Sequence, residues 1–335
     1  ISTDGAFYAR LLDVPLKDYY TKPEVALETQ IRGLRWALEE LQDDRVDLYV
    51  APDLGPIHEA VALDCPVQQT EDAPPQTVPV LESAHDVDRF QPPEPESAPR
   101  IEQAYRHFDA FVALAAEAGV KAPVRPGAVV IPPPLSCACR LMSPDMVYGL
   151  MYTEPELMMT FFDKLATTFC RLRDYADRRA GVEARTRLAL SDDAAAYVSS
   201  NMYRDLLLPH VAALFEQYGM DERHLQVDGP SSHLFPTFAD ELEVTSMKVG
   251  KLSDLRVAKH AFHGQAIVRG GLDPNDLTGD FERARPAVEH AVHTGAPDGG
   301  FVLDVCGDHI DKMNPDTLVR AVAYAKQIGQ YPVQR

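Results

Sequence analysis

The chain of 335 residues is 45% hydrophobic and 25% charged, so it can bury one large core, although this length also permits two ordinary domains. Its net charge of −19, from 51 acidic and 32 basic residues, repels a phosphate backbone and argues against nucleic acid as a partner. There is no long uncharged apolar run and no basic start followed by an apolar block, so we expect neither a membrane span nor a signal peptide.

The cysteines predict a reducing compartment. Five of them, an odd number, are scattered along the chain, which is the opposite of a disulfide framework and fits a cytoplasmic protein. Cys137 and Cys139 form C-x-C without the two-residue spacer of zinc knuckles, so packing of small residues is the favoured interpretation there.

Helical and strand patterns alternate along the chain. Apolar residues at helical spacing predict a helix over 23–42, and further helical patterns cover 101–119, 145–180 with a break before Pro155, 201–219, 253–262, 280–294 and 315–329. Short β-branched and apolar runs predict seven strands, at 47–54, 127–134, 186–193, 224–229, 242–248, 265–271 and 299–307.

This alternation predicts parallel βαβ units, and the nearly continuous apolar strands indicate a sheet covered on both faces. The pattern places seven strands, and we expect an eighth that it does not place. This count favours an α/β fold, a (β/α)₈ TIM barrel, with a doubly wound open sheet as the competing architecture. The G-x-G-x-x-G signature of the open dinucleotide-binding sheet is absent from the sequence. We expect residues 1–335 to form one domain.

Residues 71–100 interrupt the alternation after the first strand. This segment holds seven prolines and many acidic residues, which is typical of a solvated surface loop. The functional alternative is a cover over the barrel mouth.

In a parallel barrel the active site lies at the carboxyl ends of the strands, where side chains and loops converge. The polar residues at the predicted strand ends are Asp53, Ser136, Asp192, Asp193, Gln226, Asp228, Asp304, Cys306, Asp308 and His309. One ring is therefore expected to collect carboxylates, a thiol and a histidine from separate segments.

Each of these residues also has a structural interpretation. Asp192 or Asp193 can cap the following helix, and Asp228 before Gly-Pro can form an Asx turn. Cys306 can be a small buried residue, and His309 can satisfy a loop carbonyl. Convergence at one end of several strands is what favours a site.

Several stretches resemble the uroporphyrinogen decarboxylase superfamily. DLYVAPDLGPIHEAVALDCPV resembles its first strand, aspartate and short return strand, and LALSDDAAAYVSSNMYRDLLLP is similar to its Asp-containing strand with the following Ser, Tyr and Pro. LQVDG lies at the position of the H-x-C-G or H-x-D-G strand, AIVRGGLDP resembles the Gly-rich turn, and GGFVLDVCGDHIDKMNP resembles the closing strand. The likeness covers roughly residues 25–332 in matching order.

The resemblance implies a (β/α)₈ barrel that carries one of two chemistries. Its decarboxylases act without a cofactor through an aspartate that contacts pyrrole nitrogens, and Asp53 matches that aspartate. The arginine-containing N-terminal segment that binds substrate carboxylates has no counterpart in ISTDGAFYARLLDVPLKDYY. Uroporphyrinogen itself, with many carboxylates, is therefore disfavoured as the substrate.

The other chemistry is corrinoid-linked methyl transfer, in which the members that act on thiols hold zinc through H-x-C and a later Cys. Gln226 and Asp228 fill the H-x-C positions, and the late ligand falls on Asp308, or on His309 or Cys306 after a shift of one or two residues. The resemblance thus implies a zinc site from Asp228, Cys306, Asp308 and His309, although Gln226 is a poor ligand.

We expect a demethylase-type methyltransferase that moves a methyl group between a small-molecule donor and a corrinoid carried by a partner protein. The alternative is a cofactor-independent decarboxylase that acts on a porphyrinogen-like or small heteroaromatic carboxylate, and a third interpretation, favoured by Gln226, is a barrel that only binds its ligand. The predicted catalytic residues are Asp53, Asp228, Asp308 and His309, and the predicted substrate-binding residues are Gln226, Asp192, Asp193, Tyr203 and His233. The resemblance also allows a homodimer, in which the partner is a second copy of the chain.

Overall fold

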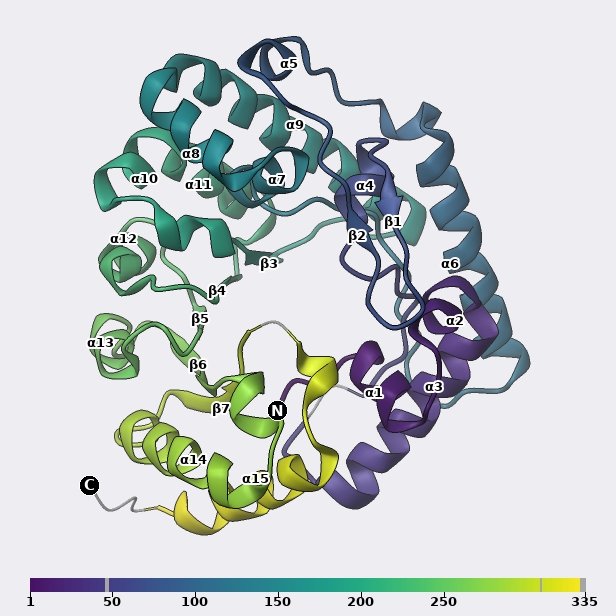
Figure 1. Ribbon diagram of the computed structural model, residues 1–335, viewed down its shortest axis with the longest axis vertical. Helices are drawn as coiled ribbons and strands as arrows, with labels where there is room; N and C mark the ends of the chain where they lie inside the picture. Colours follow the sequence, from purple (N-terminus) through teal and green to yellow (C-terminus); the bar gives the residue numbers. More distant parts are fainter. Residues whose placement is uncertain (46–47, 308, 332–335) are drawn as a thin grey trace.

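The computed structural model describes residues 1–45, 48–307 and 309–331 (Figure 1). Short helices and extended segments make up the first third of the chain, and strands alternate with helices in the remainder. Over the described ranges, the helices are all too short or too polar to cross a membrane.

A parallel sheet forms the centre of the molecule. Its strands are β3 (Arg187–Ser191), β4 (Glu222–Val227), β5 (Ser246–Val249), β6 (Ile267–Leu272) and β7 (Phe301–Val305), which lie side by side in chain order. Every neighbouring pair is parallel, and the connecting helices lie outside the curved sheet (Figure 1). The fold is therefore an α/β barrel of the TIM type, as the alternation of patterns predicted.

The strands present two different faces. One row in register, packed against the helices, is apolar: Leu190, Leu225, Met247, Val268 and Phe301. Because side chains alternate along a strand, the next row points to the inner side. That inner row is mostly polar: Ser191, Gln226, Lys248, Arg269 and Val302. The inside of this barrel is thus lined by hydrogen-bonding and charged groups.

The strands predicted at 47–54 and 127–134 are wrong for the described residues. A single parallel bridge joins Val50 to Val124, in which the Val50 N–H donates to the carbonyl of Pro123 at 3.0 Å. Prolines without an N–H explain why no ladder extends from this bridge. They stand at positions 52, 123, 126, 132 and 133.

The helices confirm the predicted patterns. Their bounds are α1 (Gly5–Leu11), α2 (Leu16–Thr21), α3 (Pro23–Trp36), α4 (His58–Ala62), α5 (Ala84–Arg89), α6 (Pro99–Glu117), α7 (Pro134–Leu141), α8 (Pro144–Thr153), α9 (Pro155–Ala180), α10 (Ser200–Leu206), α11 (Leu208–Tyr218), α12 (Phe235–Asp240), α13 (Leu255–Ala261), α14 (Phe281–Gly295) and α15 (Pro315–Ile328). Several begin at a proline, whose missing N–H has no helical acceptor at that position. The pattern at 201–219 divides at Leu207, just before Pro209 in α11.

The proline-rich segment 71–100 has structure of its own. It contains the second strand of the hairpin β1 (Val67–Gln68) and β2 (Gln76–Thr77), helix α5 and a 3₁₀ turn at Pro95–Ser97. Three cations spaced seven residues apart along α9 bind it: Lys164 donates to backbone carbonyls, Arg171 pairs with Glu94 at 2.6 Å and Arg178 pairs with Glu96 at 2.6 Å. Because this spacing places all three on one face of the helix, the segment follows α9 along its length.

Candidate functional site

The carboxyl ends of β4 and β7 bring an acid and a thiol together. Asp228 directly follows β4, and Cys306 directly follows β7. The Cys306 thiol donates to Oδ1 of Asp228 at 2.6 Å, and the amide of Gln226 donates to the same oxygen at 3.0 Å. Segments 78 residues apart in sequence thus form one cluster, which we call the Asp228–Cys306 pair.

The backbone around Asp228 is held from two sides. Its N–H donates to Oδ1 of Asp193, at the end of β3, at 2.8 Å, and Asp193 in turn lies 3.3 Å from the hydroxyl of Ser191. On the opposite side, a Cβ at Gly250 would lie 2.0 Å from the Asp228 carbonyl oxygen, so only glycine allows the following strand to approach this closely. The carboxyl of Asp228 is therefore presented by a tightly packed strand end.

The electrostatic field keeps the thiol protonated. Burial raises the pKa of Cys306 far above its usual range, and the neighbouring charges of Asp228 and Asp193 raise it further, while Lys248 acts in the opposite direction. Cys306 is therefore a thiol rather than a thiolate, and it donates to the carboxyl group of Asp228. A buried, protonated thiol is a poor nucleophile, so the pair is better suited to holding and moving a proton.

Lys248 and Arg269, on the inner face of β5 and β6, are functional candidates that the sequence analysis missed. Lys248 Nζ lies 3.5 Å from Oδ2 of Asp304 on β7, and Arg269 donates to that oxygen at 3.0 Å. Burial would raise the pKa of Asp304, but these cations and the N–H of Ser2 outweigh it and hold this pKa low. Both cations lie inside apolar-patterned strands, and only the sheet register reveals that they share a face with Gln226.

Asp53 lies in a second acidic cluster at the mouth. It accepts from the Tyr19 hydroxyl at 3.0 Å and from the Gly55 N–H at 2.7 Å. Burial, with the charges of Asp53 and Asp311, raises the pKa of Asp4 to about 6. No single short stretch of sequence predicts this cluster, because its members come from α1, α2, the 48–54 segment and the turn after β7.

Arg10 links this cluster to the hairpin. It donates to Oδ2 of Asp311 at 2.6 Å and to the backbone carbonyl of Asp72 at 2.6 Å, while Lys17 pairs with Glu71 at 2.6 Å. Pro75 lies within van der Waals reach of Gly55, two residues beyond Asp53. The tip of the β1–β2 hairpin is thus held against the same part of the mouth as Asp53.

Two predicted substrate-binding residues are buried, which does not fit direct contact with a substrate. Asp192 accepts from the Ser136 hydroxyl at 2.7 Å, and burial raises the pKa of its carboxyl to about 6. Tyr203 is enclosed in α10, where its ring packs against Phe238 with ring centroids 5.5 Å apart. The prediction that the Asp192 carboxyl caps the turn that follows it is wrong, because the side chain makes no capping bond there and bonds instead to Ser136 in the first turn of α7.

The remaining predicted residues lie apart from the pair or outside the described residues. Nε2 of His233 donates to the carbonyl oxygen of Val198 at 2.8 Å and so joins two loops beside the mouth. His309 is exposed, with a left-handed backbone at φ 67°. Asp308 lies outside the described residues. Within those residues, no three His, Cys, Asp or Glu side chains are grouped as metal ligands, so the four-residue zinc site stays a prediction.

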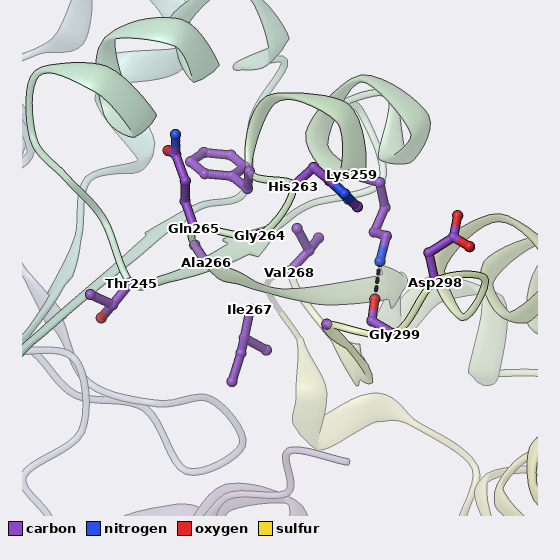
Figure 2. Close-up of a pocket in the computed structure, with 12 residues that line it drawn as sticks. Thr245, Lys259, His263, Gly264, Gln265, Ala266, Ile267, Val268, Asp298 and Gly299 are labelled. Atoms are coloured by element: carbon purple, nitrogen blue, oxygen red, sulfur yellow. Dashed lines mark hydrogen bonds between the residues drawn. The ribbon is translucent and has the colours of Figure 1, made fainter.

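Two cavities in the described residues lie on different sides of the barrel. One of about 330 Å³ is lined by Thr245, Ile267 and Gly300, which lie at the amino ends of β5, β6 and β7 (Figure 2). There Lys259 donates to the Gly299 carbonyl (Figure 2). The second, of about 260 Å³, borders Ser191 at the carboxyl end of β3. Since TIM-barrel active sites lie at the carboxyl ends, only the second cavity is on the side of the Asp228–Cys306 pair.

This combination of a barrel with polar residues at its carboxyl mouth agrees with the comparison to known families. Residues 6–328 match the family described as Uroporphyrinogen decarboxylase (URO-D). The chain belongs to the URO-D family. Among solved structures this URO-D family protein is similar to a methyltransferase from Methanosarcina mazei, with 14% identity, a TM-score of 0.69, and coverage of 97% of this chain and 91% of that chain.

No curated protein matches the sequence of this URO-D family protein. The likeness to the methyltransferase is one of fold, because 14% identity is too low to carry over an activity. Family membership and the mouth geometry together identify an enzyme fold, and the reaction must be argued from the side chains themselves.

Proposed function

We propose that this URO-D family protein transfers a methyl group from a small methylated molecule to a corrinoid carried by a partner protein. The observation that carries the proposal is the contact of 2.6 Å between Cys306 and Asp228 at the carboxyl ends of β7 and β4. The resemblance to a structure named as a methyltransferase over 97% of the chain supports it.

The reaction has a definite proton requirement. Cobalt(I) supplies the electron pair that forms the new cobalt–carbon bond, and the bond between the methyl carbon and its heteroatom breaks with its electron pair left on the heteroatom. That heteroatom then takes up one proton, so an alkoxide or amide leaving group needs an acid close by. The enzyme's contribution is to orient the donor and to supply this proton.

Asp228 is the acid that we assign to this step. Its Oδ1 accepts bonds from both Cys306 and Gln226, so the orientation of the carboxyl is set before substrate binds. In its protonated form the carboxyl donates to the leaving heteroatom, while the Cys306 thiol remains bound to Oδ1. Lys248 and Asp193 set the charge around the pair. Cys306 is then a positioning residue and Asp228 the catalytic one.

Zinc is the cofactor that the family resemblance suggests for this position. Carboxylate and thiolate are both donors that zinc accepts, but a catalytic zinc normally has three protein ligands. In the part of the chain that the structure describes, Asp228 and Cys306 have no third His, Cys, Asp or Glu ligand arranged with them. The described donors alone do not complete a zinc site, Asp308 lies outside the described residues, and the proposed proton transfer needs only the side chains of Asp228 and Cys306.

Decarboxylation is the second candidate, and the geometry of Asp53 favours it. Asp53 is fixed by Tyr19 and by a backbone N–H at the mouth, where a carboxylate would stabilise a cationic heteroaromatic ring as carbon dioxide leaves. The surrounding carboxyl groups of Asp4 and Asp311 repel a substrate with many carboxylates. A small heteroaromatic acid is therefore the substrate class for this alternative.

One assay distinguishes the two reactions. The protein is mixed with cobalt(I) cobalamin and a panel of O-methyl, N-methyl and S-methyl compounds, and the formation of methylcobalamin is followed by its visible spectrum. We expect Asp228→Asn to lower the rate by roughly 100-fold or more, as removal of a general acid does. Asp88→Asn makes the same chemical change on an exposed surface and should leave the rate unchanged.

Cys306→Ser tests the positioning role, because serine keeps a donor toward Asp228 and alanine does not. We expect Cys306→Ser to retain most of the activity and Cys306→Ala to lose it. Full activity in Asp228→Asn would refute the proposal. Carbon dioxide release that Asp53→Asn abolishes, without methylcobalamin formation, would establish the decarboxylase instead.

A further inference from the structure

A cavity of about 260 Å³ lies where the sheet stops at β3. Residues 130–133 line one side of it, and Ala189, Leu190 and Ser191 of β3 line the other. In the described residues no ladder joins these two segments, as the strand pairing of β3 is with β4. The cavity therefore occupies the seam in the barrel wall, and we call it the seam cavity.

A partly buried arginine that forms no ion pair in the described residues lines the seam cavity. Arg173 of α9 stacks over Phe169, with its guanidinium carbon 5.7 Å from the ring centroid. Its Nε is buried and has no hydrogen-bond partner, and no ion pair joins Arg173 to a carboxylate of the described residues. Asp177, whose charge acts on Arg173, is already paired with Arg185 through two hydrogen bonds.

Without a bound anion, this arrangement of Arg173 lowers the stability of the folded protein. Burial lowers the pKa of Arg173, and the charge of Arg185 lowers it further, which shows that the surroundings disfavour the cation. Guanidinium groups nevertheless remain protonated in proteins. A cation that is withdrawn from water even in part is normally compensated by a carboxylate or another anion, and leaving it uncompensated lowers the stability of the fold. Arg173 is thus prepared for an anionic partner from outside the chain.

A second unsatisfied group lines the same cavity. Nδ1 of His58, at the start of α4, is buried and has no hydrogen-bond partner in the described part of the chain. Burial lowers the pKa of His58, so the free ring is neutral near pH 7. Two unsatisfied nitrogen groups from α4 and α9, far apart in sequence, therefore border one space.

The other charges around the seam cavity leave the positive charge of Arg173 uncancelled. Glu59 also lines it, but its Oε1 accepts from the Thr77 hydroxyl at 2.9 Å and lies 3.8 Å from Nε of Arg140. Since Glu59 and Arg140 compensate one another, the net charge at the wall is that of Arg173. Phe169 and three prolines, at positions 56, 132 and 133, give the remaining wall an apolar character.

We infer that the seam cavity binds the carboxylate of a small organic molecule with an apolar body. Arg173 pairs with the carboxylate, Nδ1 of His58 accepts from a hydroxyl group of the ligand, and the aromatic and proline wall covers the apolar part. A planar guanidinium matches the two oxygens of a carboxylate. Ser191 borders the cavity and pairs in register with Gln226, so a molecule bound here extends toward the Asp228–Cys306 pair.

This inference concerns binding and does not depend on methyl transfer. The test is thermal unfolding of the full chain with sodium benzoate, sodium phosphate or sodium chloride at equal ionic strength. Benzoate should raise Tm in a saturable way, by roughly 2–4 °C at high occupancy, and the other salts should not. Isothermal titration with benzoate gives the affinity independently of unfolding.

Three variants make the result specific. Arg173→Leu should lose the response to benzoate, and its Tm without ligand should equal or exceed that of the wild type because a partly buried, uncompensated charge is removed. Arg173→Lys keeps the positive charge but loses the planar pair of N–H donors that matches a carboxylate, and it should weaken benzoate binding at least tenfold. Arg171→Leu changes the net charge equally on the exposed face of the same helix and should respond as the wild type does.

The response of these variants to benzoate shows whether the seam cavity binds a carboxylate. Stabilisation by benzoate that Arg173→Leu abolishes and Arg171→Leu retains supports the seam cavity as a carboxylate site. An equal response in Arg173→Leu, a response to phosphate alone, or no response to benzoate would overturn it. If Arg173→Leu does not fold, unchanged benzoate affinity in Arg173→Lys would overturn it as well.

Discussion

Replacing Asp192 by asparagine should remove the contribution of this carboxyl group to the pH dependence of folding. The Asp192 carboxyl is buried, and burial raises its pKa from 3.8 to about 6, although its bonds to Ser136 act in the opposite direction. Because the folded state holds this proton more tightly than the unfolded state, the stabilisation is fully present below about pH 4 and is lost as pH rises through about 6.

The magnitude follows from the shift. A change of about two pKa units corresponds to about 3 kcal/mol, of which about 2–3 kcal/mol is lost between pH 4 and pH 8. The assay is urea unfolding at both pH values, monitored by circular dichroism. The change in the free energy of unfolding from pH 4 to pH 8 should be more positive by that amount in Asp192→Asn than in the wild type, because the variant lacks this loss. Taking this difference cancels the constant cost of burying the amide.

Asp88→Asn is the matched control, since it makes the same change on a side chain in solvent. Its pH dependence should follow the wild type. If Asp192→Asn shows the same pH dependence as the wild type, the buried carboxyl is not protonated in the folded state near pH 5, and the assignment of Asp192 as a buried structural acid fails.

Three further stability predictions follow from the packing. Arg10→Gln should lower the free energy of unfolding at pH 7 by about 2 kcal/mol, measured by urea unfolding, because buried Asp311 loses a hydrogen bond of 2.6 Å to a cation. An unchanged free energy of unfolding would show that solvent already compensates the Asp311 carboxylate. Gly270→Ala should prevent soluble expression or lower the free energy of unfolding by more than about 3 kcal/mol. The backbone φ at this position is +126°, and the new Cβ would lie 2.3 Å from the carbonyl oxygen of Val249. A melting curve equal to that of the wild type would contradict this prediction. Phe215→Ala, in the core, should cost about 3–5 kcal/mol in the same assay, and a loss below 1 kcal/mol would mean that the core refills the space.

The second half of the fold could be predicted from sequence because local pattern and tertiary role agree there. The strands predicted from 186–193 to 299–307 overlap β3 to β7, and the helical patterns between them overlap α11, α13 and α14. The first third could not be predicted equally well. Apolar character indicated strands at 47–54 and 127–134, but prolines removed the donors that a ladder needs, and α1 and α2 are too short to show a clear period.

The site was predicted only in part. Asp228 and Gln226 belong to one strand end, and their proximity follows from spacing alone. The choice of Cys306 as the partner of Asp228 needed the backbone path after β7, because neighbouring positions were equally compatible with the sequence. Lys248 became visible only through the sheet register, and Arg173 only through the lack of a partner, which no sequence pattern reports.

The bonds between Ser2 and Asp304 have a consequence for how the molecule is made. Ser2 donates its N–H to Oδ1 of Asp304 at 2.6 Å and its hydroxyl to Oδ2 at 3.0 Å, across 302 residues of sequence. During synthesis the early residues emerge from the ribosome long before β7 exists, so this junction can form only when translation of the last strand is complete. Until then Lys248 and Arg269 lack their shared carboxylate, and the nascent barrel remains open on the side where its two ends will meet.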